Sequence, residues 1–274
     1  MKTEKERADL LAVRQGLFDT REKAKRAIMA GTVYYNESRV DKPGEKISVD
    51  QPLFVKGKIC PYVGRGGYKL EKALKYFQID LNGKVMVDIG SSTGGFTDCG
   101  LQHGVALSYA IDVGTNQLAW KLRNDHRVIV MEKTNFRYVT YAHFQKGIPN
   151  FASIDVSFIS LRLILPVVRE IMADNSEIVC LVKPQFEAGK EQVGKKGIVR
   201  DVKIHVDILH NIVEFARSQG FSVQGLTFSP ITGGDGNIEF LLYLKWRFAS
   251  EEAEKTMDPS AVVQAAHETF ELKK

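Results

Sequence analysis

The segment from residue 85 to residue 96 restricts the fold of this chain more than any other. An apolar run of strand length passes directly into a turn that contains Gly90, Gly94 and Gly95. Beyond this turn, apolar segments of strand length alternate with segments of helical periodicity. The alternation predicts an α/β fold built on a doubly wound parallel sheet.

The predicted elements place polar residues at one edge of that sheet. Strands are expected at residues 85–89, 107–112, 128–131, 151–156, 177–183, 222–228 and 238–244. Helices are expected at residues 95–103, 115–124, 160–173 and 203–219. In doubly wound sheets, ligands bind outside the carboxyl ends of the strands. The residues that fall at these ends, where we expect a site, are Asp88, Asp112, Asp155 and Lys183.

The glycine turn excludes two common nucleotide sites. A dinucleotide site requires G-x-G-x-x-G and a phosphate-binding loop requires Gly-Lys-Ser or Gly-Lys-Thr, and the turn has neither. The spacing Asp88-x-Gly90-x-x-x-Gly94-Gly95 instead resembles the cofactor loop of S-adenosylmethionine-dependent methyltransferases. In that Rossmann-like fold, an acid at the position of Asp112 binds the ribose of the cofactor.

The resemblance implies S-adenosyl-L-methionine as cofactor. The residues expected to bind it are Asp88, Gly90, Ser91, Ser92, Thr93, Gly94, Gly95, Phe96, Asp112, Asn135 and Asp155. Asn135 is expected to border the adenine, and a loop residue without function is the alternative.

The N-terminal part is predicted to be a small ααβ module that binds a polyanion. Residues 1–60 carry most of the net charge of +5, and lysine and arginine gain affinity for phosphates by releasing counterions. Helices are expected from Glu4 to Arg14 and from Asp19 or Thr20 to Gly31, followed by a strand at residues 32–36 and two short apolar segments.

This module resembles the small αL RNA-binding domain. The likeness rests on Arg7-Ala8-Asp9-Leu10-Leu11, Thr20-Arg21-Glu22-Lys23-Ala24-Lys25, Ile28-Met29-Ala30-Gly31-Thr32-Val33, Asn36 and Lys42-Pro43. It implies that basic side chains around the second helix face RNA, namely Arg7, Arg21, Lys23, Lys25 and Arg26. The alternative is an exposed helix face with solvated charges.

The chain is expected to divide into four parts. These are an RNA-binding domain (1–58), a glycine-rich basic linker (59–68), a methyltransferase domain (69–247) and a tail (248–274). The linker carries Arg65 and is expected to order on RNA. A basic loop at residues 189–197, with Lys190, Lys195 and Lys196, is predicted to clamp RNA beside the site, unless it is merely a solvated loop.

Four residues indicate which atom receives the methyl group. Lys69, Asp155, Lys183 and Glu239 resemble the Lys-Asp-Lys-Glu set of the FtsJ-type ribose 2′-O-methyltransferases. Two alternatives have less support. The chain has Asp155-Val156-Ser157-Phe158 where amine methyltransferases have Asn/Asp-Pro-Pro-aromatic, and Cys180 lies inside a predicted strand, where a thiol packs.

Longer motifs extend this likeness to the TlyA family over residues 3–246. They are Gly64-Arg65-Gly66-Gly67-Tyr68-Lys69-Leu70, Ser91-Ser92-Thr93-Gly94-Gly95-Phe96-Thr97-Asp98, Asp155-Val156-Ser157-Phe158-Ile159-Ser160 and Lys183-Pro184-Gln185-Phe186-Glu187. The family consists of ribosomal RNA 2′-O-methyltransferases that act on cytidine and are often labelled haemolysins. The resemblance therefore implies ribosomal RNA or a ribosomal subunit as partner.

The chemistry accounts for these residue types. A ribose hydroxyl is a poor nucleophile at neutral pH, so its attack on a sulfonium methyl group needs a positioned base. Lys183 is the candidate, because burial and a second cation, Lys69, favour the neutral form of a lysine. Asp155 is expected to orient Lys183, and Glu239 to hold Lys69 or the ribose.

Other features exclude some classes of protein. No apolar run is long enough to span a bilayer and the first thirty residues do not resemble a signal peptide, which predicts a cytoplasmic protein without a membrane partner. The three cysteines and six histidines form no metal-ligand spacing, so we expect no metal and read the histidines as surface or packing residues. A terminal helix is expected from Asp258-Pro259-Ser260. Whether it docks, and the oligomeric state, are left open.

Two rival functions are retained. One is a ribosome-assembly factor that binds RNA without catalysis, and the other is a membrane-active haemolysin. The second lacks an amphipathic or spanning segment in the sequence.

Overall fold

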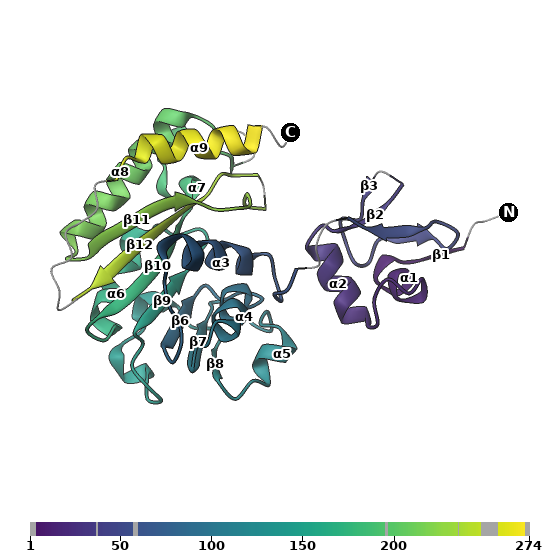
Figure 1. Ribbon diagram of the computed structural model, residues 1–274, viewed down its shortest axis with the longest axis horizontal. Coiled ribbons are helices and arrows are strands. Elements are labelled where there is room, and N and C mark those ends of the chain that lie inside the picture. The colour runs from purple at the N-terminus through teal and green to yellow at the C-terminus, as the bar shows by residue number, and fades with distance from the viewer. Residues whose placement is uncertain are drawn as a thin grey trace. The chain divides into compact units, whose positions relative to one another are not determined.

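The computed structural model describes residues 4–36, 38–56, 60–194, 197–234, 236–247 and 257–271. The chain forms two compact units, Met1–Arg65 and Gly66–Lys274, and Figure 1 labels most of their elements.

The smaller unit packs two helices against short strands. Helices α1 (Ala8–Arg14) and α2 (Arg21–Met29) accompany two small sheets. One sheet pairs β1 (Lys5–Arg7) with β4 (Lys46–Ser48), and the other has the order β3 (Ser38–Arg39), β2 (Val33–Tyr35) and β5 (Leu53–Val55). Its core is apolar and contains Ala8, Leu11, Ala24, Ile28 and Val33.

The ends of these helices follow from local chemistry. Thr20 caps α2 by accepting a hydrogen bond from the Lys23 N–H at 3.3 Å, as predicted. The expected start of the first helix at Glu4 is wrong, because residues 5–7 pair with β4 as a strand and α1 begins only at Ala8.

The larger unit contains a seven-stranded sheet with the order β11-β12-β10-β9-β6-β7-β8. The five strands from β10 to β8 run parallel, and β12 is antiparallel to both β10 and β11. Their bounds are β6 Val85–Ile89, β7 Leu107–Ile111, β8 Val128–Met131, β9 Phe151–Ile154, β10 Ser176–Val182, β11 Ser222–Phe228 and β12 Phe240–Trp246. The doubly wound α/β fold expected from the sequence is confirmed.

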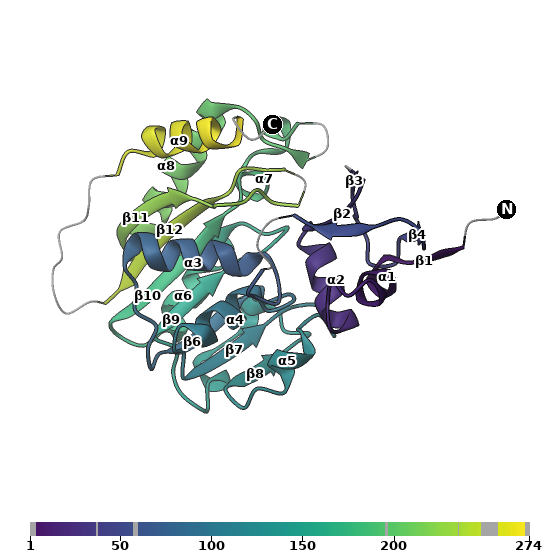
Figure 2. The ribbon, with the colours of Figure 1, turned by 45° about the vertical axis from the view of Figure 1, so that its right-hand side comes forward.

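Helices cover both faces of this sheet (Figures 1 and 2). Helices α3 (Gly66–Phe77) and α4 (Gly95–Gln102) lie together on one face, and α6 (Leu165–Ile171) and α8 (Val202–Ser218) lie on the other. The short helices α5 (Trp120–Arg123) and α7 (Pro184–Glu187) follow β7 and β10. Single 3₁₀ turns occur at Phe136–Tyr138, Tyr141–His143, Leu161–Leu163 and Lys190–Gln192.

Three expected helices begin later or earlier than predicted. α3 starts at Gly66, inside the expected linker, rather than at Lys69. The helix expected at 115–124 is reduced to α5, and the backbone N–H groups of residues 116 and 117 donate to the Glu132 carboxylate instead. The helix expected from residue 160 begins with a 3₁₀ turn, and α6 follows with Pro166 in its first turn.

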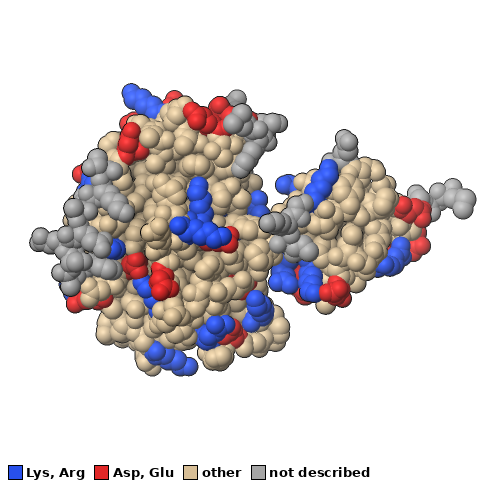
Figure 3. All heavy atoms as spheres, in the orientation of Figure 1, with Lys and Arg blue, Asp and Glu red and all other residues tan. Residues whose placement is uncertain are grey.

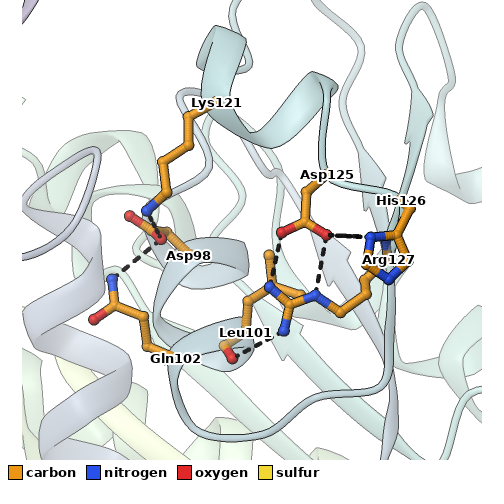
Figure 4. Close-up of polar contacts among 7 residues, drawn as sticks. All are labelled: Asp98, Leu101, Gln102, Lys121, Asp125, His126 and Arg127. Carbon is orange, nitrogen blue, oxygen red and sulfur yellow. Dashed lines mark hydrogen bonds and ion pairs between the residues drawn. The ribbon is translucent and has the colours of Figure 1, made fainter.

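Side-chain contacts hold α5 and the segment after it against α4 (Figure 4). The buried Asp98 carboxylate accepts from Lys121 Nζ at 3.0 Å and from Gln102 Nε2 at 3.1 Å. Arg127 pairs with Asp125 at 2.7 Å and donates to the Leu101 carbonyl oxygen of α4 at 3.5 Å. A helix of only four residues is thereby fixed beside the glycine turn.

The C-terminal helix α9 (Pro259–Glu271) docks on α8 and β11, which resolves the question left open by the sequence. Val263 and Ala266 are buried in the core of the larger unit. His205 and His267 share a hydrogen bond of 2.9 Å between α8 and α9.

Two of the cysteines lie buried inside the larger unit. Cys99 and Cys180 are buried thiols outside any disulfide, and burial raises the pKa of the Cys180 thiol well above its ordinary value. Cys180 therefore packs, as expected. Throughout the part of the chain that the structure describes, no helix is long and apolar enough to cross a membrane.

Candidate active site

Four charged side chains from separate elements converge at the carboxyl edge of the sheet. Lys69 projects from α3, Asp155 follows β9 directly, and Lys183 follows β10. Glu239 immediately precedes β12, and since β12 is antiparallel to β10, its start lies at the same edge. The sheet topology thus brings together residues that are up to 170 positions apart in the sequence.

The four side chains form a row of alternating charge. Lys69 Nζ lies 2.7 Å from Glu239 Oε2 and 3.6 Å from Asp155 Oδ2. Asp155 Oδ1 lies 2.5 Å from Lys183 Nζ. The exposed fractions of the side chains are between 3% and 19%, so each charge depends on its neighbour, because a buried ion without a partner is costly.

Glycines make room for this row. A Cβ atom on Gly233 would lie 2.7 Å from Glu239 Oε1, which is closer than packing allows. A Cβ on Gly66, the first residue of α3, would lie 4.0 Å from Asp155 Oδ2 and 3.5 Å from the Phe96 ring. The backbone at Gly233 therefore approaches the Glu239 carboxylate closely, whereas a Cβ at Gly66 would make only ordinary van der Waals contacts.

The turn after β9 adds two residues that the sequence reading did not assign to the site. Ser157 Oγ accepts a hydrogen bond of 3.1 Å from Lys183 Nζ. Phe158 is 90% exposed, has a left-handed φ of +62°, and lies 5.0 Å from the Phe186 ring between centroids. The sequence signal that could have assigned them to the site is their position, since a polar and an aromatic residue directly follow the candidate Asp155 and Val156.

The glycine turn lies beside this row, and its conformation requires glycine. Gly90 has a φ of +84°, and a Cβ there would lie 2.5 Å from the Asp155 carbonyl oxygen. Gly94 has a φ of +92°, and a Cβ would lie 2.2 Å from Leu122. Neither position tolerates a side chain.

The second predicted acid joins this turn to the next strand. Asp112 Oδ2 accepts from the Ser92 N–H at 2.7 Å, and Oδ1 accepts from the Gly114 N–H at 2.8 Å. Ser92 and Thr93 are exposed. The turn thus presents backbone and hydroxyl groups to solvent next to a carboxylate.

Three residues predicted to bind the cofactor have other contacts in the structure. The fully buried Asp88 carboxylate accepts from the Thr97 N–H and hydroxyl, at 3.0 and 2.7 Å, and from the Ser153 hydroxyl at 2.9 Å. Burial raises the pKa of Asp88 to about 6. Asp88 therefore ties β6 to α4 and β9. The Phe96 ring is buried, and the exposed Asn135 caps a 3₁₀ turn.

The residues predicted to bind RNA are mostly exposed in the smaller unit. Four of them lie on the solvent side of α2: Arg21, Lys23, Lys25 and Arg26. The buried Asp9 carboxylate pairs with Arg7 at 3.0 Å and with Arg21 at 2.9 Å, and Figure 3 shows basic and acidic atoms side by side in this unit.

The remaining basic residues are only partly described. Arg65 is exposed. Lys195, Lys196 and the side chain of Lys190 lie outside the described residues. Within the described ranges, no group of His, Cys, Asp and Glu is arranged to hold a metal ion.

Comparisons with known proteins agree with this geometry. The family model of the FtsJ-like methyltransferases matches residues 62–246, and that of the S4 domain matches residues 6–52. A Bacillus subtilis protein named "Putative rRNA methyltransferase YqxC" is 62% identical over 276 residues, which cover 100% of this chain and 98% of its own.

Two further relatives extend the comparison. The Mycobacterium tuberculosis protein "16S/23S rRNA (cytidine-2'-O)-methyltransferase TlyA" is 40% identical over 240 residues, with 87% of this chain and 89% of its own covered. A solved structure described as "Putative hemolysin from Streptococcus thermophilus" is 54% identical and superimposes with a TM-score of 0.79, covering 99% of this chain and 98% of its own. With its S4 domain at the N-terminus, this chain therefore belongs to the TlyA family of FtsJ-like methyltransferases.

Proposed function

We propose that this methyltransferase transfers the methyl group of S-adenosyl-L-methionine to the 2′-hydroxyl of a ribose in ribosomal RNA, with cytidine as the target nucleotide. The observation that carries the proposal is the row Glu239, Lys69, Asp155 and Lys183 at the edge where the parallel strands end. The name of the M. tuberculosis relative, a cytidine-2'-O-methyltransferase, supports cytidine as the target nucleotide and its 2′-oxygen as the acceptor.

The residues of the glycine turn fit the cofactor. Gly90 and Gly94 keep the backbone free of side chains there. Each Asp112 oxygen accepts one backbone hydrogen bond and has further lone-pair capacity for the ribose hydroxyls of an adenosine. When bound, S-adenosyl-L-methionine supplies an electrophilic methyl group on a sulfonium. In this proposal Asp88 acts by shaping the turn rather than by touching the ligand.

Lys183 is the base in this proposal. As the ribose oxygen bonds to the methyl carbon, its proton passes to the lone pair of the Lys183 amine, and the carbon–sulfur bond breaks with its electrons left on sulfur. The positive charge thus moves from the sulfonium to Lys183, where the Asp155 carboxylate at 2.5 Å stabilises it. Glu239 compensates Lys69, so that Asp155 remains available to Lys183.

Phe158 is suited to hold the target base. RNA enzymes that act on single nucleotides commonly stack the unstacked base on an aromatic ring. Phe158 offers such a face, because it is 90% exposed and follows Asp155 by three positions. Stacking there would bring the attached ribose near Lys183.

We assign RNA binding to residues 1–58 and methyl transfer to residues 69–247. The exposed cations of α2, together with Arg7 and Arg65, would neutralise phosphates and supply affinity that does not depend on sequence. Residues 189–197 would contact RNA beside the site. Ribosomal RNA as substrate places the reaction in the cytoplasm.

Transfer of labelled methyl from S-adenosyl-L-methionine to purified ribosomal subunits tests this function. We expect label in alkali-resistant linkages with the wild type and none with Lys183→Ala. RNA binding without any label would favour the assembly factor. Release of dye from liposomes by the pure protein, with no label in RNA, would favour a haemolysin.

A further inference from the structure

The Lys183 amine has two oxygen partners rather than one. Asp155 Oδ1 lies 2.5 Å from Nζ and Ser157 Oγ accepts from it at 3.1 Å. The Phe186 ring centroid is 5.9 Å from the same nitrogen. Ser157 is exposed while Lys183 is buried, so the hydrogen bond joins a buried amine to a residue at the surface.

Asp155 alone does not fix the direction of the lone pair. One acceptor sets the rotation of the amine about its last carbon–nitrogen bond, but the lone pair of a neutral amine can still occupy either of the two remaining positions. Asp155 is also shared, because its second oxygen lies 3.6 Å from Lys69. A second acceptor at a different angle takes one of those positions for an N–H group and leaves the other to the lone pair.

A neutral amine has two N–H bonds and one lone pair. When both N–H groups donate, to Asp155 and to Ser157, the lone pair occupies the one remaining direction. After proton transfer the third N–H occupies that same direction. We propose that Ser157 is a positioning residue that aims the Lys183 lone pair at the ribose hydroxyl, an inference that rests on the proposed 2′-O-methyl transfer.

The turn that carries Ser157 is itself fixed to the segment that carries Lys183. Glu187 lies in α7, which begins directly after Lys183. Its carboxylate accepts from the Ser160 hydroxyl at 2.6 Å and from the Leu161 N–H at 2.8 Å. The segments that carry the serine and the lysine are therefore tied to each other by these two hydrogen bonds.

The variant Ser157→Ala removes only the hydroxyl group that accepts the hydrogen bond from Lys183 Nζ. We expect the single-turnover rate of methyl transfer to fall on the order of 10- to 100-fold, as for a misaligned reacting group. The KM for RNA and the Kd for S-adenosyl-L-methionine should stay unchanged. Ser157→Thr keeps the hydroxyl and should restore most of the rate.

Ser218→Ala is the matched control. It removes the same hydroxyl group from the last residue of α8, where Ser218 Oγ donates a hydrogen bond to the Phe215 carbonyl oxygen. A rate for Ser157→Ala within about twofold of wild type, with Lys183→Ala inactive, would overturn the role of Ser157 while leaving the proposed function intact. A loss confined to the KM for RNA would also overturn it, since Ser157 would then be an RNA contact. Full activity of Lys183→Ala would instead remove the proposed base.

Discussion

The pair formed by Lys69 and Glu239 should couple stability to catalysis. Glu239 is 2% exposed and its carboxylate lies 2.7 Å from Lys69 Nζ, while Asp155 is the more distant partner of that lysine at 3.6 Å. Lys69→Met removes the cation and leaves the Glu239 carboxylate buried beside an apolar side chain. Glu239→Gln removes the anion but keeps an oxygen that can accept from Lys69.

The two changes should differ in cost. Loss of one partner from a buried ion pair lowers the free energy of unfolding by about 3–5 kcal/mol, which is the expected cost of Lys69→Met. Glu239→Gln should cost less, about 1–3 kcal/mol, because a hydrogen bond survives and Asp155 still faces Lys69. In the double variant no unpaired carboxylate is left, so its cost should fall below the sum by roughly 1–3 kcal/mol.

Urea unfolding of the four proteins, followed by circular dichroism, measures this coupling, and methyl transfer to RNA is assayed in parallel. All three variants should lose most activity, since each changes the charges next to Asp155. Costs that add within about 0.5 kcal/mol would show that the two side chains do not stabilise one another, and the reasoning about the row of charges would fail.

Three other predictions concern single positions. Gly90→Ala places a Cβ 2.5 Å from the Asp155 carbonyl oxygen at a φ of +84°. Calorimetry should therefore show a lower Tm, and titration should show that affinity for S-adenosyl-L-methionine is lost. Wild-type values of both quantities would contradict the close approach of the two backbone segments. Phe158→Ala should raise the KM for RNA by roughly tenfold, because a base–aromatic stack contributes about 1–3 kcal/mol. The Tm should stay unchanged, since the side chain is exposed. An unchanged KM would show that Phe158 does not stack on the target base. Burial, with repulsion from His267, lowers the pKa of His205 from 6.5 to about 4, so stability is fully present above pH 6.5 and falls as the pH drops toward 4. Between pH 7 and pH 5 this histidine should account for about 2 kcal/mol, which a comparison of wild type with His205→Gln in urea at both pH values would detect; equal pH dependence in the two proteins would refute it.

Much of the site was accessible from the sequence because sheet topology governs it. Asp155 and Lys183 end neighbouring parallel strands, so their meeting follows once the strands are located. Lys69 and Glu239 were harder, since neither follows a parallel strand, and only the likeness to a known residue set indicated them. Their convergence depends on the antiparallel β12 and on α3.

Other features of the site depend on the direction in which a side chain points, which the spacing of apolar and polar residues in the sequence does not predict. Asp88 ends an apolar strand and was expected to face the ligand, but Thr97 and Ser153 satisfy its carboxylate inside the protein. The contact of Ser157 with Lys183 occurs in an irregular turn whose next residue has a left-handed backbone. Such turns are set by tertiary contacts, here with α7, and not by a local pattern of residues.

The docking of α9 illustrates the same limit. Its helical pattern from residue 259 was readable, but the pattern does not say which surface receives the apolar face. The receiving surface is made by α8 and β11. His205 and His267, which meet there, were expected from the sequence to be surface or packing residues.

The measurement that tests the central claim most directly is the identity of the methylated nucleoside. Ribosomal subunits treated with the wild type, Lys183→Ala or Ser218→Ala are digested to nucleosides and analysed by mass spectrometry. We expect 2′-O-methylcytidine with the wild type and Ser218→Ala, and none with Lys183→Ala. A methyl group on the base, or equal 2′-O-methylcytidine with Lys183→Ala, would contradict it.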